Sequence, residues 1–150
     1  MSDVSVIGTG AMGSALVEGL GASGVDVTVW NRTRARAEPL SGPRVRLAES
    51  VGEALMSSPL TIMSVLDHKV ACTLVEGVGQ DLKGRVVASI SFVTPARHDS
   101  SHPSSAQREA YLDLEIAALP RQVRSRSGIR DVRGAAPVVH RGFGRRARGD

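Results

Sequence analysis

Residues 4–13, Val4-Ser5-Val6-Ile7-Gly8-Thr9-Gly10-Ala11-Met12-Gly13, decide the fold of this chain. The first four form an apolar run that predicts a buried strand, and Gly8 ends it. Three glycines then follow the spacing G-x-G-x-x-G. From Met12 onward apolar residues recur four apart, which predicts a helix that stops at Gly24. A glycine-rich turn between a strand and a helix is typical of the phosphate-binding loop in a dinucleotide-binding βαβ unit.

Each glycine of this loop has an expected role. Gly8 lets the chain turn tightly, Gly10 lets a pyrophosphate approach the main chain, and Gly13 lets the helix pack close to the strand. The helix that begins at Ala11 points free N–H groups and the positive end of its dipole at the phosphates. The alternative is a glycine-rich turn that binds nothing.

Beyond this unit, strand and helix patterns alternate. Apolar runs predict strands at residues 25–30, 45–47, 60–65 and 85–91, with a possible sixth at 111–116. Thr33 is expected to cap a short helix through Leu40, Ser50 and Glu53 have capping-box spacing, and Asp67 is expected to cap a helix whose apolar face holds Val70, Leu74 and Val78. This alternation predicts an α/β fold, a Rossmann-type doubly wound parallel sheet with right-handed crossovers.

Charge and periodicity divide the chain in two. Residues 1–123 carry 11 Lys+Arg and 13 Asp+Glu, whereas residues 124–150 carry eight Arg and two Asp. No helical or strand period continues after Pro120. We expect a Rossmann domain over residues 1–123 and an irregular, disordered, arginine-rich tail over 124–150. The tail would bind polyanions weakly through its charge, but no nucleic-acid-binding motif accompanies it, so no specific nucleic-acid partner is expected.

Composition excludes several classes of protein. The single cysteine, Cys72, excludes a disulfide scaffold and a cysteine-based zinc site, and it fits a reducing cytoplasm. No apolar run approaches the ~18 residues of a membrane span. The N-terminus lacks the basic region of a secretory signal. The four histidines lack metal-ligand spacing. We expect a cytoplasmic protein with no metal and no membrane partner.

The segment after the second predicted strand bears on the choice of nucleotide. An NAD site normally has Asp or Glu there, to accept hydrogen bonds from the ribose hydroxyls. This chain has Asn31-Arg32-Thr33 instead. Arg32 would attract a 2′-phosphate and stack on adenine, Asn31 and Thr33 would donate hydrogen bonds, and Arg34 or Arg36 would add charge. The segment therefore predicts NADP rather than NAD. The alternative is that these arginines only solvate the start of a helix.

Two motifs resemble a known family. Residues 6–13 and 29–33 resemble the NADP-binding domain of the 6-phosphogluconate dehydrogenase and β-hydroxyacid dehydrogenase superfamily, with imine reductases the most similar members. Leu66-Asp67, Ser91 with Thr94-Pro95, and Tyr111-Leu112-Asp113 followed by Pro120-Arg121-Gln122 also fit the imine-reductase pattern.

The resemblance implies an oxidoreductase that transfers hydride between NADP(H) and a small-molecule substrate, an imine or a hydroxyacid. It implies contacts to the pyrophosphate, to the 2′-phosphate, to the nicotinamide-side ribose and to the nicotinamide itself. Thr9, Gly10, Ala11 and Met12 would contact the pyrophosphate, and Asn31, Arg32 and Thr33 the 2′-phosphate. Val65 and Leu66 would contact the nicotinamide-side ribose, and Ser91 the nicotinamide.

Some features depart from that family. Phe92 stands where a small hydroxyl residue is usual, and Leu114-Glu115 replaces a small pair. Relatives continue into a helical second domain, through which they dimerise and which supplies the proton donor. In hydroxyacid dehydrogenases that donor is a lysine, and this sequence has no lysine after Lys83. We therefore expect a truncated relative with no assigned catalytic residue and a tail that is a frameshift product. The alternative is a catalytically inactive nucleotide-binding remnant.

Overall fold

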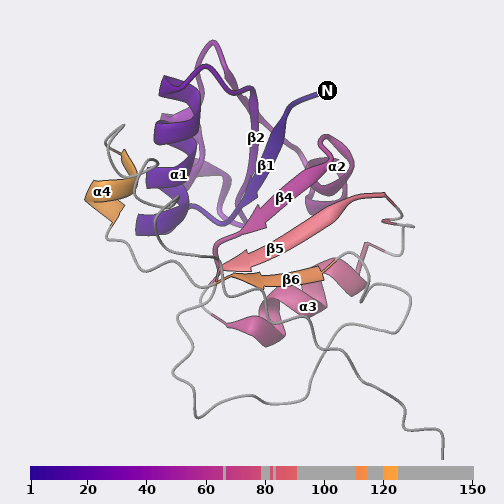
Figure 1. Ribbon diagram of the computed structural model, residues 1–150. Helices are drawn as coiled ribbons and strands as arrows, with labels where there is room; N and C mark the ends of the chain where they lie inside the picture. Colours follow the sequence, from indigo (N-terminus) through magenta and orange to yellow (C-terminus); the bar gives the residue numbers. More distant parts are fainter. Residues whose placement is uncertain (66, 79–81, 83, 91–110, 115–119, 125–150) are drawn as a thin grey trace, which may run out of the picture.

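A computed structural model of the 150-residue chain describes residues 1–65, 67–78, 82, 84–90, 111–114 and 120–124 (Figure 1). Its sheet has six strands in the order β3-β2-β1-β4-β5-β6, and all five neighbouring pairs are parallel. The strands are β1 Val4–Ile7, β2 Val27–Trp30, β3 Val45–Leu47, β4 Leu60–Met63, β5 Val86–Ile90 and β6 Tyr111–Leu114. The direction of winding reverses between β1 and β4, which is where ligands bind in doubly wound sheets. The predicted fold class is confirmed.

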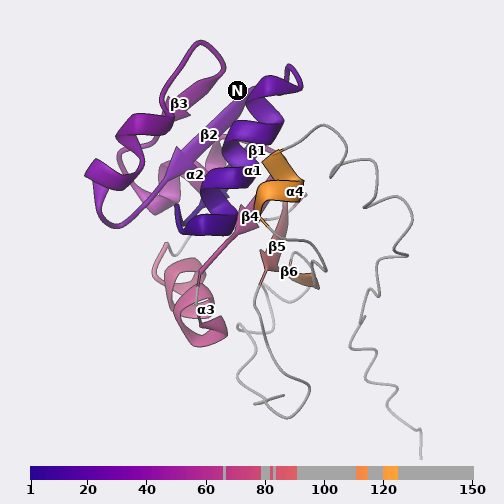
Figure 2. The same ribbon diagram turned by 90° about the vertical axis from the view of Figure 1, so that its left-hand side faces the viewer.

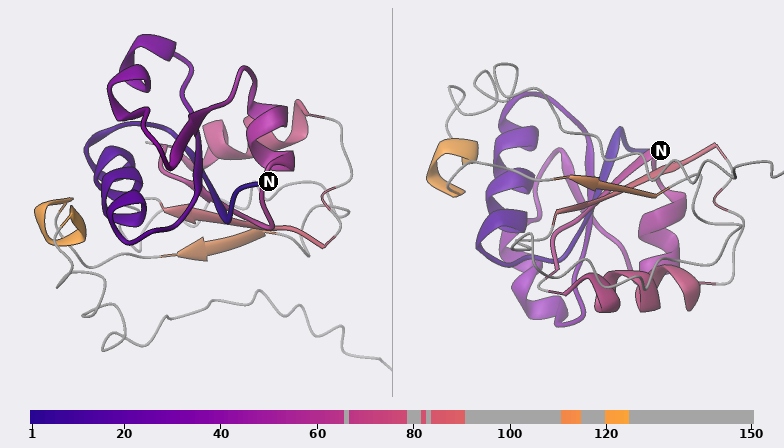
Figure 3. Two further views of the ribbon diagram at one scale, coloured as in Figure 1. Left: turned by 90° about the horizontal axis from the view of Figure 1, so that it is seen from above. Right: turned by 60° about the horizontal axis from the view of Figure 1, so that its bottom comes forward.

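Helices cover both faces of this sheet. On one side α1 lies beside α4, and on the other lie α2 and α3 (Figures 2 and 3). The helices are α1 Ala11–Ala22, α2 Val51–Met56, α3 His68–Glu76 and α4 Pro120–Arg124, and two single 3₁₀ turns are η1 Arg34–Arg36 and η2 Glu38–Leu40. None of the helices in the described part of the chain has the length and apolar character to cross a membrane.

Alternating side chains of the strands build two cores, one on each face of the sheet. The core under α1 contains Val6, Val17, Val27, Val29 and Ala37. The core under α2 and α3 contains Ile7, Ala48, Ala54, Leu55, Met63, Ala71, Val75, Leu82 and Val87. Because both faces are covered, the central strands are buried along most of their length, and their polar residues Ser5, Thr28, Thr61 and Ser89 are buried too. Each large buried side chain contributes about 1.5–3 kcal/mol to folding.

Two of the three predicted helix caps are present. The Ser50 hydroxyl accepts a hydrogen bond from the Glu53 N–H at 3.0 Å, and the Asp67 carboxylate accepts one from the Lys69 N–H at 2.9 Å. The Thr33 cap is wrong, because its side chain caps nothing and the segment to Leu40 forms the turns η1 and η2. Pro39 lacks the N–H that a continuous α-helix would need at that position, which accounts for the break.

The buried face of α3 differs from the predicted one. Leu74 and Val78 pack against the core as expected, but Val70 is 45% exposed. The fully buried positions of this helix are Ala71 and Val75, one residue further along. The prediction for Val70 was therefore wrong, because Ala71 takes the inward position in the first turn.

The last described segment corrects another expectation. Residues 120–124, where no periodic structure was expected, form α4. Val123 is 4% exposed and packs with Met12 and Ala15 of α1, and Arg124 forms an ion pair with Glu18. Five residues are too few to reveal a helical period, so this contact gave no signal in the sequence. Residues 125–150 lie outside the described residues, so the irregular tail and the boundary at 123 stay predictions.

Candidate dinucleotide-binding site

The loop between β1 and α1 has no room for a side chain at two of its glycines. Gly8 has a φ of +95°, which favours glycine, and a Cβ there would lie 2.3 Å from the Ser64 carbonyl oxygen at the end of β4. A Cβ on Gly13 would lie 1.9 Å from the carbonyl oxygen of Gly8. In both cases the obstacle is main chain, which cannot rotate away. The predicted roles of Gly8 and Gly13 therefore agree with the geometry.

Gly10 is the opposite case. A Cβ at this position would meet no atom within 4 Å, and the backbone is extended, with φ −69° and ψ −173°. Gly10 is also the N-cap of α1, so no side chain caps the helix, and the first turn contains no acidic residue. The first main-chain bond of the helix is donated by Ser14 to the Gly10 carbonyl at 2.9 Å. The preceding N–H groups, of Ala11, Met12 and Gly13, thus have no partner within the helix.

Thr9 lies between the tight and the open part of the loop. It is 8% exposed, and its Oγ1 is buried without a hydrogen-bond partner among the described residues. Its main-chain groups are bonded: the carbonyl accepts from the Ser14 hydroxyl at 3.2 Å, and the N–H donates to Asn31 Oδ1 at 3.1 Å. Buried hydroxyls are normally hydrogen-bonded, so Thr9 Oγ1, like Ser89 Oγ, is an exception among the described residues.

Asn31, immediately after β2, joins this loop to the next one. Its Oδ1 accepts from the Thr9 N–H, and its Nδ2 donates to the Thr33 carbonyl at 2.9 Å. Beside it, the Gly8 N–H donates to the Trp30 carbonyl at 2.9 Å. The carboxyl ends of β1 and β2 are thereby held together by side-chain and main-chain bonds.

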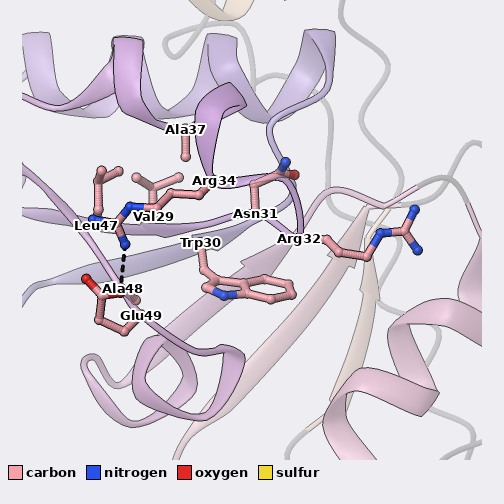
Figure 4. A pocket seen from close by; sticks show the side chains of 9 residues that line it. All are labelled: Val29, Trp30, Asn31, Arg32, Arg34, Ala37, Leu47, Ala48 and Glu49. Atoms are coloured by element: carbon pink, nitrogen blue, oxygen red, sulfur yellow. Dashed lines mark hydrogen bonds and ion pairs between the residues drawn. The ribbon is translucent and has the colours of Figure 1, made fainter.

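A pocket of about 190 Å³ lies at the ends of β2 and β3 (Figure 4). Its volume is below the roughly 300–1,000 Å³ of complete small-molecule sites. It therefore fits one end of a dinucleotide and not the whole molecule. The lining residues are Val29, Trp30, Asn31, Arg32, Arg34, Ala37, Leu47, Ala48 and Glu49.

The arginines of this region fall into two groups. Arg34 is held by two carboxylates: its Nη1 lies 2.8 Å from Glu49 Oε2, and its Nε lies 3.5 Å from Glu38 Oε1. Arg32 and Arg36 are exposed and form no ion pair within the part of the chain that the structure describes. In Figure 4 the Arg32 side chain extends away from Arg34 and Glu49. An incoming phosphate would therefore meet Arg32 and Arg36 uncommitted and Arg34 already neutralised.

Most of the predicted contact residues lie together in space. Residues 8–13, 31–33 and Val65 all lie at the carboxyl ends of β1, β2 and β4, and Val65 Cγ1 would be 3.3 Å from a Cβ on Gly8. Thr33 lies on the same edge and is exposed. Leu66 and Ser91 lie outside the described residues, so their predicted contacts stay predictions.

Two further residues line the pocket directly after β3 and were not predicted from the sequence, Ala48 and Glu49. A signal for them existed. Because β3 was expected to run parallel to β2, the residues after both strands had to meet at one edge of the sheet. Over the described residues, no group of three or more His, Cys, Asp or Glu is placed to hold a metal ion.

Comparison with known proteins agrees with this geometry. Residues 3–114 match the family model described as the NAD binding domain of 6-phosphogluconate dehydrogenase. The NADPH-dependent reductive aminase of Aspergillus oryzae is 30% identical over 92 residues, which are 61% of this chain and 31% of that protein.

Solved structures give the same result. An imine reductase from Aspergillus terreus in complex with NADPH4 superposes with a TM-score of 0.72 at 27% identity, covering 81% of this chain and 43% of that one. An imine reductase from Myxococcus stipitatus in complex with NADP+ has a TM-score of 0.68 at 34% identity, covering 79% and 42%. The chain thus spans less than half the length of these proteins. It belongs to the family of the NAD binding domain of 6-phosphogluconate dehydrogenase.

Proposed function

We propose that this chain is the NADP(H)-binding domain of an oxidoreductase that transfers hydride between the nicotinamide and an imine or a hydroxyacid or carbonyl substrate. The observation that carries the proposal is the pairing of two features at one sheet edge. One is an uncapped helix start behind an open glycine, and the other is a pair of uncommitted arginines with no acid in residues 31–33.

The glycine loop fits a pyrophosphate. The unbonded N–H groups at the start of α1 carry partial positive charge, and the open space at Gly10 lets phosphate oxygens reach them. No acidic side chain in the first turn opposes the charge of the ligand.

The segment after β2 fits a 2′-phosphate. Arg32, which lines the pocket, would hold it with help from Arg36, and the pocket would take the adenosine end. Glu49, the acid that lines this pocket, is neutralised by Arg34 at 2.8 Å and therefore repels a phosphate less than a free carboxylate would.

The relatives support the assignment of the reaction class. Bound NADPH would supply the hydride, and this chain would bind and orient it at the carboxyl edge of the sheet. The matched relatives include an NADPH-dependent reductive aminase and imine reductases. The residues that would hold the substrate and donate the proton are not assigned to this chain.

A titration tests the binding proposal. Trp30, the only tryptophan, lines the pocket, so its fluorescence reports nucleotide binding directly. We expect NADPH to bind at least roughly tenfold more tightly than NADH, because the charge-assisted contacts to the 2′-phosphate are worth about 1.5–3 kcal/mol. Equal affinity for the two would contradict the phosphate assignment, and no binding of either would overturn the proposal.

A turnover assay tests the reaction. NADPH absorbance is followed with cyclic imines and with small keto acids and aldehydes as substrates. Consumption supports the oxidoreductase assignment. Binding without consumption supports the alternative, a nucleotide-binding module without activity of its own.

A further inference from the structure

The Asn31 side chain is engaged on both sides within the protein. Its Oδ1 accepts the Thr9 N–H at 3.1 Å, 22 residues away in sequence, and its Nδ2 donates to the Thr33 carbonyl at 2.9 Å. Only one orientation of the amide satisfies both partners, because an N–H needs an acceptor and a carbonyl needs a donor. The side chain is therefore fixed as a bridge between the glycine loop at residues 8–13 and the arginine segment at residues 31–36.

The bridge acts on the loop at a sensitive point. Thr9 lies between Gly8, which is enclosed by main chain, and Gly10, which faces open space. Thr9 is only 8% exposed. If the Asn31 side chain were removed, the Thr9 N–H would lose its acceptor at a place where water does not readily replace it. The direction of the following N–H groups depends on how Thr9 is held.

We propose that Asn31 is a positioning residue for the pyrophosphate site, acting through Thr9, and that it supports NADP and NAD binding to the same extent. This rests on the proposed function. It differs from the expectation that Asn31 donates to the 2′-phosphate, which would make its contribution specific to NADP. Loss of the positioning role leaves the ratio of the two affinities unchanged, whereas loss of a 2′-phosphate contact lowers the preference for NADPH over NADH.

Two substitutions separate the roles. Asn31→Ala removes the acceptor, and we expect the Kd values for NADPH and NADH to rise by a similar factor, roughly tenfold, with their ratio unchanged within about threefold. Asn31→Asp keeps an acceptor for the Thr9 N–H, but it removes the donor to the Thr33 carbonyl and adds a negative charge beside the 2′-phosphate. It should retain NADH binding within about threefold of the original chain while NADPH binding falls by more than roughly tenfold.

A second readout needs no nucleotide. Hydrogen exchange at the Thr9 amide should accelerate in Asn31→Ala and stay protected in Asn31→Asp. Arg32→Ala is the comparison variant, since it should weaken NADPH alone and leave Thr9 protected. A loss of NADPH binding in Asn31→Ala with NADH binding unchanged, or a Thr9 amide equally protected in all variants, would overturn the proposal.

Failure of the positioning role of Asn31 can be told apart from failure of the proposed nucleotide-binding function. If the original chain binds neither nucleotide, the proposed function is wrong, and the exchange rate of the Thr9 amide still tests the bridge. If the original chain binds NADPH and only the ratio changes in Asn31→Ala, the proposed function stands and the positioning role is wrong.

Discussion

The glycine loop at residues 8–13 and the arginine segment at residues 31–36 lie side by side at one edge of the sheet, but they are built differently. In the loop the ligand would meet main-chain N–H groups, and two positions leave no room for a Cβ. In the segment it would meet long, exposed side chains. The first is therefore part of the fold, whereas the second can change without unfolding the domain. This difference predicts which substitutions affect stability and which affect only the choice of nucleotide.

The largest effect is expected from Gly13→Ala. The new Cβ would lie 1.9 Å from the Gly8 carbonyl oxygen, so either α1 or the loop must move. We expect the free energy of unfolding to fall by about 3 kcal/mol or more, measured by denaturant titration. Gly10→Ala is the matched control in the same loop, because its Cβ meets open space. It should lower stability by at most about 1 kcal/mol, through the loss of an N-cap glycine, and should weaken NADPH binding. Similar stability of the two variants would show that the main chain around Gly13 does not exclude a side chain.

Next in size is Arg32→Ala. Because this side chain is exposed and unpaired within the described residues, unfolding should be unaffected, while the Kd for NADPH rises by roughly 10–100-fold and that for NADH stays nearly constant. Arg34→Ala is the control on the same segment, and we expect at most about a threefold effect, since Glu49 and Glu38 already hold this guanidinium. Isothermal titration calorimetry measures all four values. A larger effect at Arg34 than at Arg32 would reverse the assignment.

A smaller effect is expected from salt, which should weaken binding at the exposed arginines more than binding at the main-chain N–H groups of the glycine loop. Exposed charges are screened over a Debye length of about 10 Å at 0.1 M salt and about 3 Å at 1 M. Raising the salt concentration over this range should therefore weaken NADPH binding several-fold and NADH binding less. Identical salt dependence for both nucleotides would show that the arginines do not contact the 2′-phosphate.

The smallest effect concerns Glu53, whose carboxylate accepts a hydrogen bond from the N–H of the pocket residue Glu49. The Glu49 N–H, at 2.8 Å, and the Arg46 guanidinium hold the pKa of the Glu53 carboxyl below its ordinary value of 4.5. This stabilisation is complete above pH 4.5 and is lost as the pH falls through the lowered pKa of the folded state. Glu53→Gln should cost at most about 1 kcal/mol at pH 7, and the difference from the original chain should shrink in acid. A constant difference across pH would contradict this account.

The sequence was sufficient to predict the strands, because each central strand is buried on both faces and consists mostly of apolar residues, with a single buried Ser or Thr. It also predicted the glycine loop, since only glycine fits where Gly8 and Gly13 meet main chain. The structure of the segment after β2 was harder to predict from the sequence. Whether Thr33 caps a helix, or which arginine is free, depends on Pro39 and on carboxylates at Glu38 and Glu49 that a local pattern does not connect.

Contacts between residues far apart in the sequence could not be predicted either. The bridge from Asn31 to Thr9 joins residues 22 positions apart, and its existence depends on the parallel pairing of β1 with β2. The packing of α4 on α1 joins residues more distant still. Such contacts follow from topology, so they become visible only after the sheet order is known.

The packing of α4 on α1 has a consequence for synthesis of the protein. The ion pair between Arg124 and Glu18 joins residues 106 positions apart, and Val123 covers Met12 and Ala15. At a translation rate of about 5–20 residues per second, the ribosome adds those intervening residues in roughly 5–20 s. Throughout that interval α4 cannot yet cover Met12 and Ala15 of α1, so this contact forms only late in synthesis.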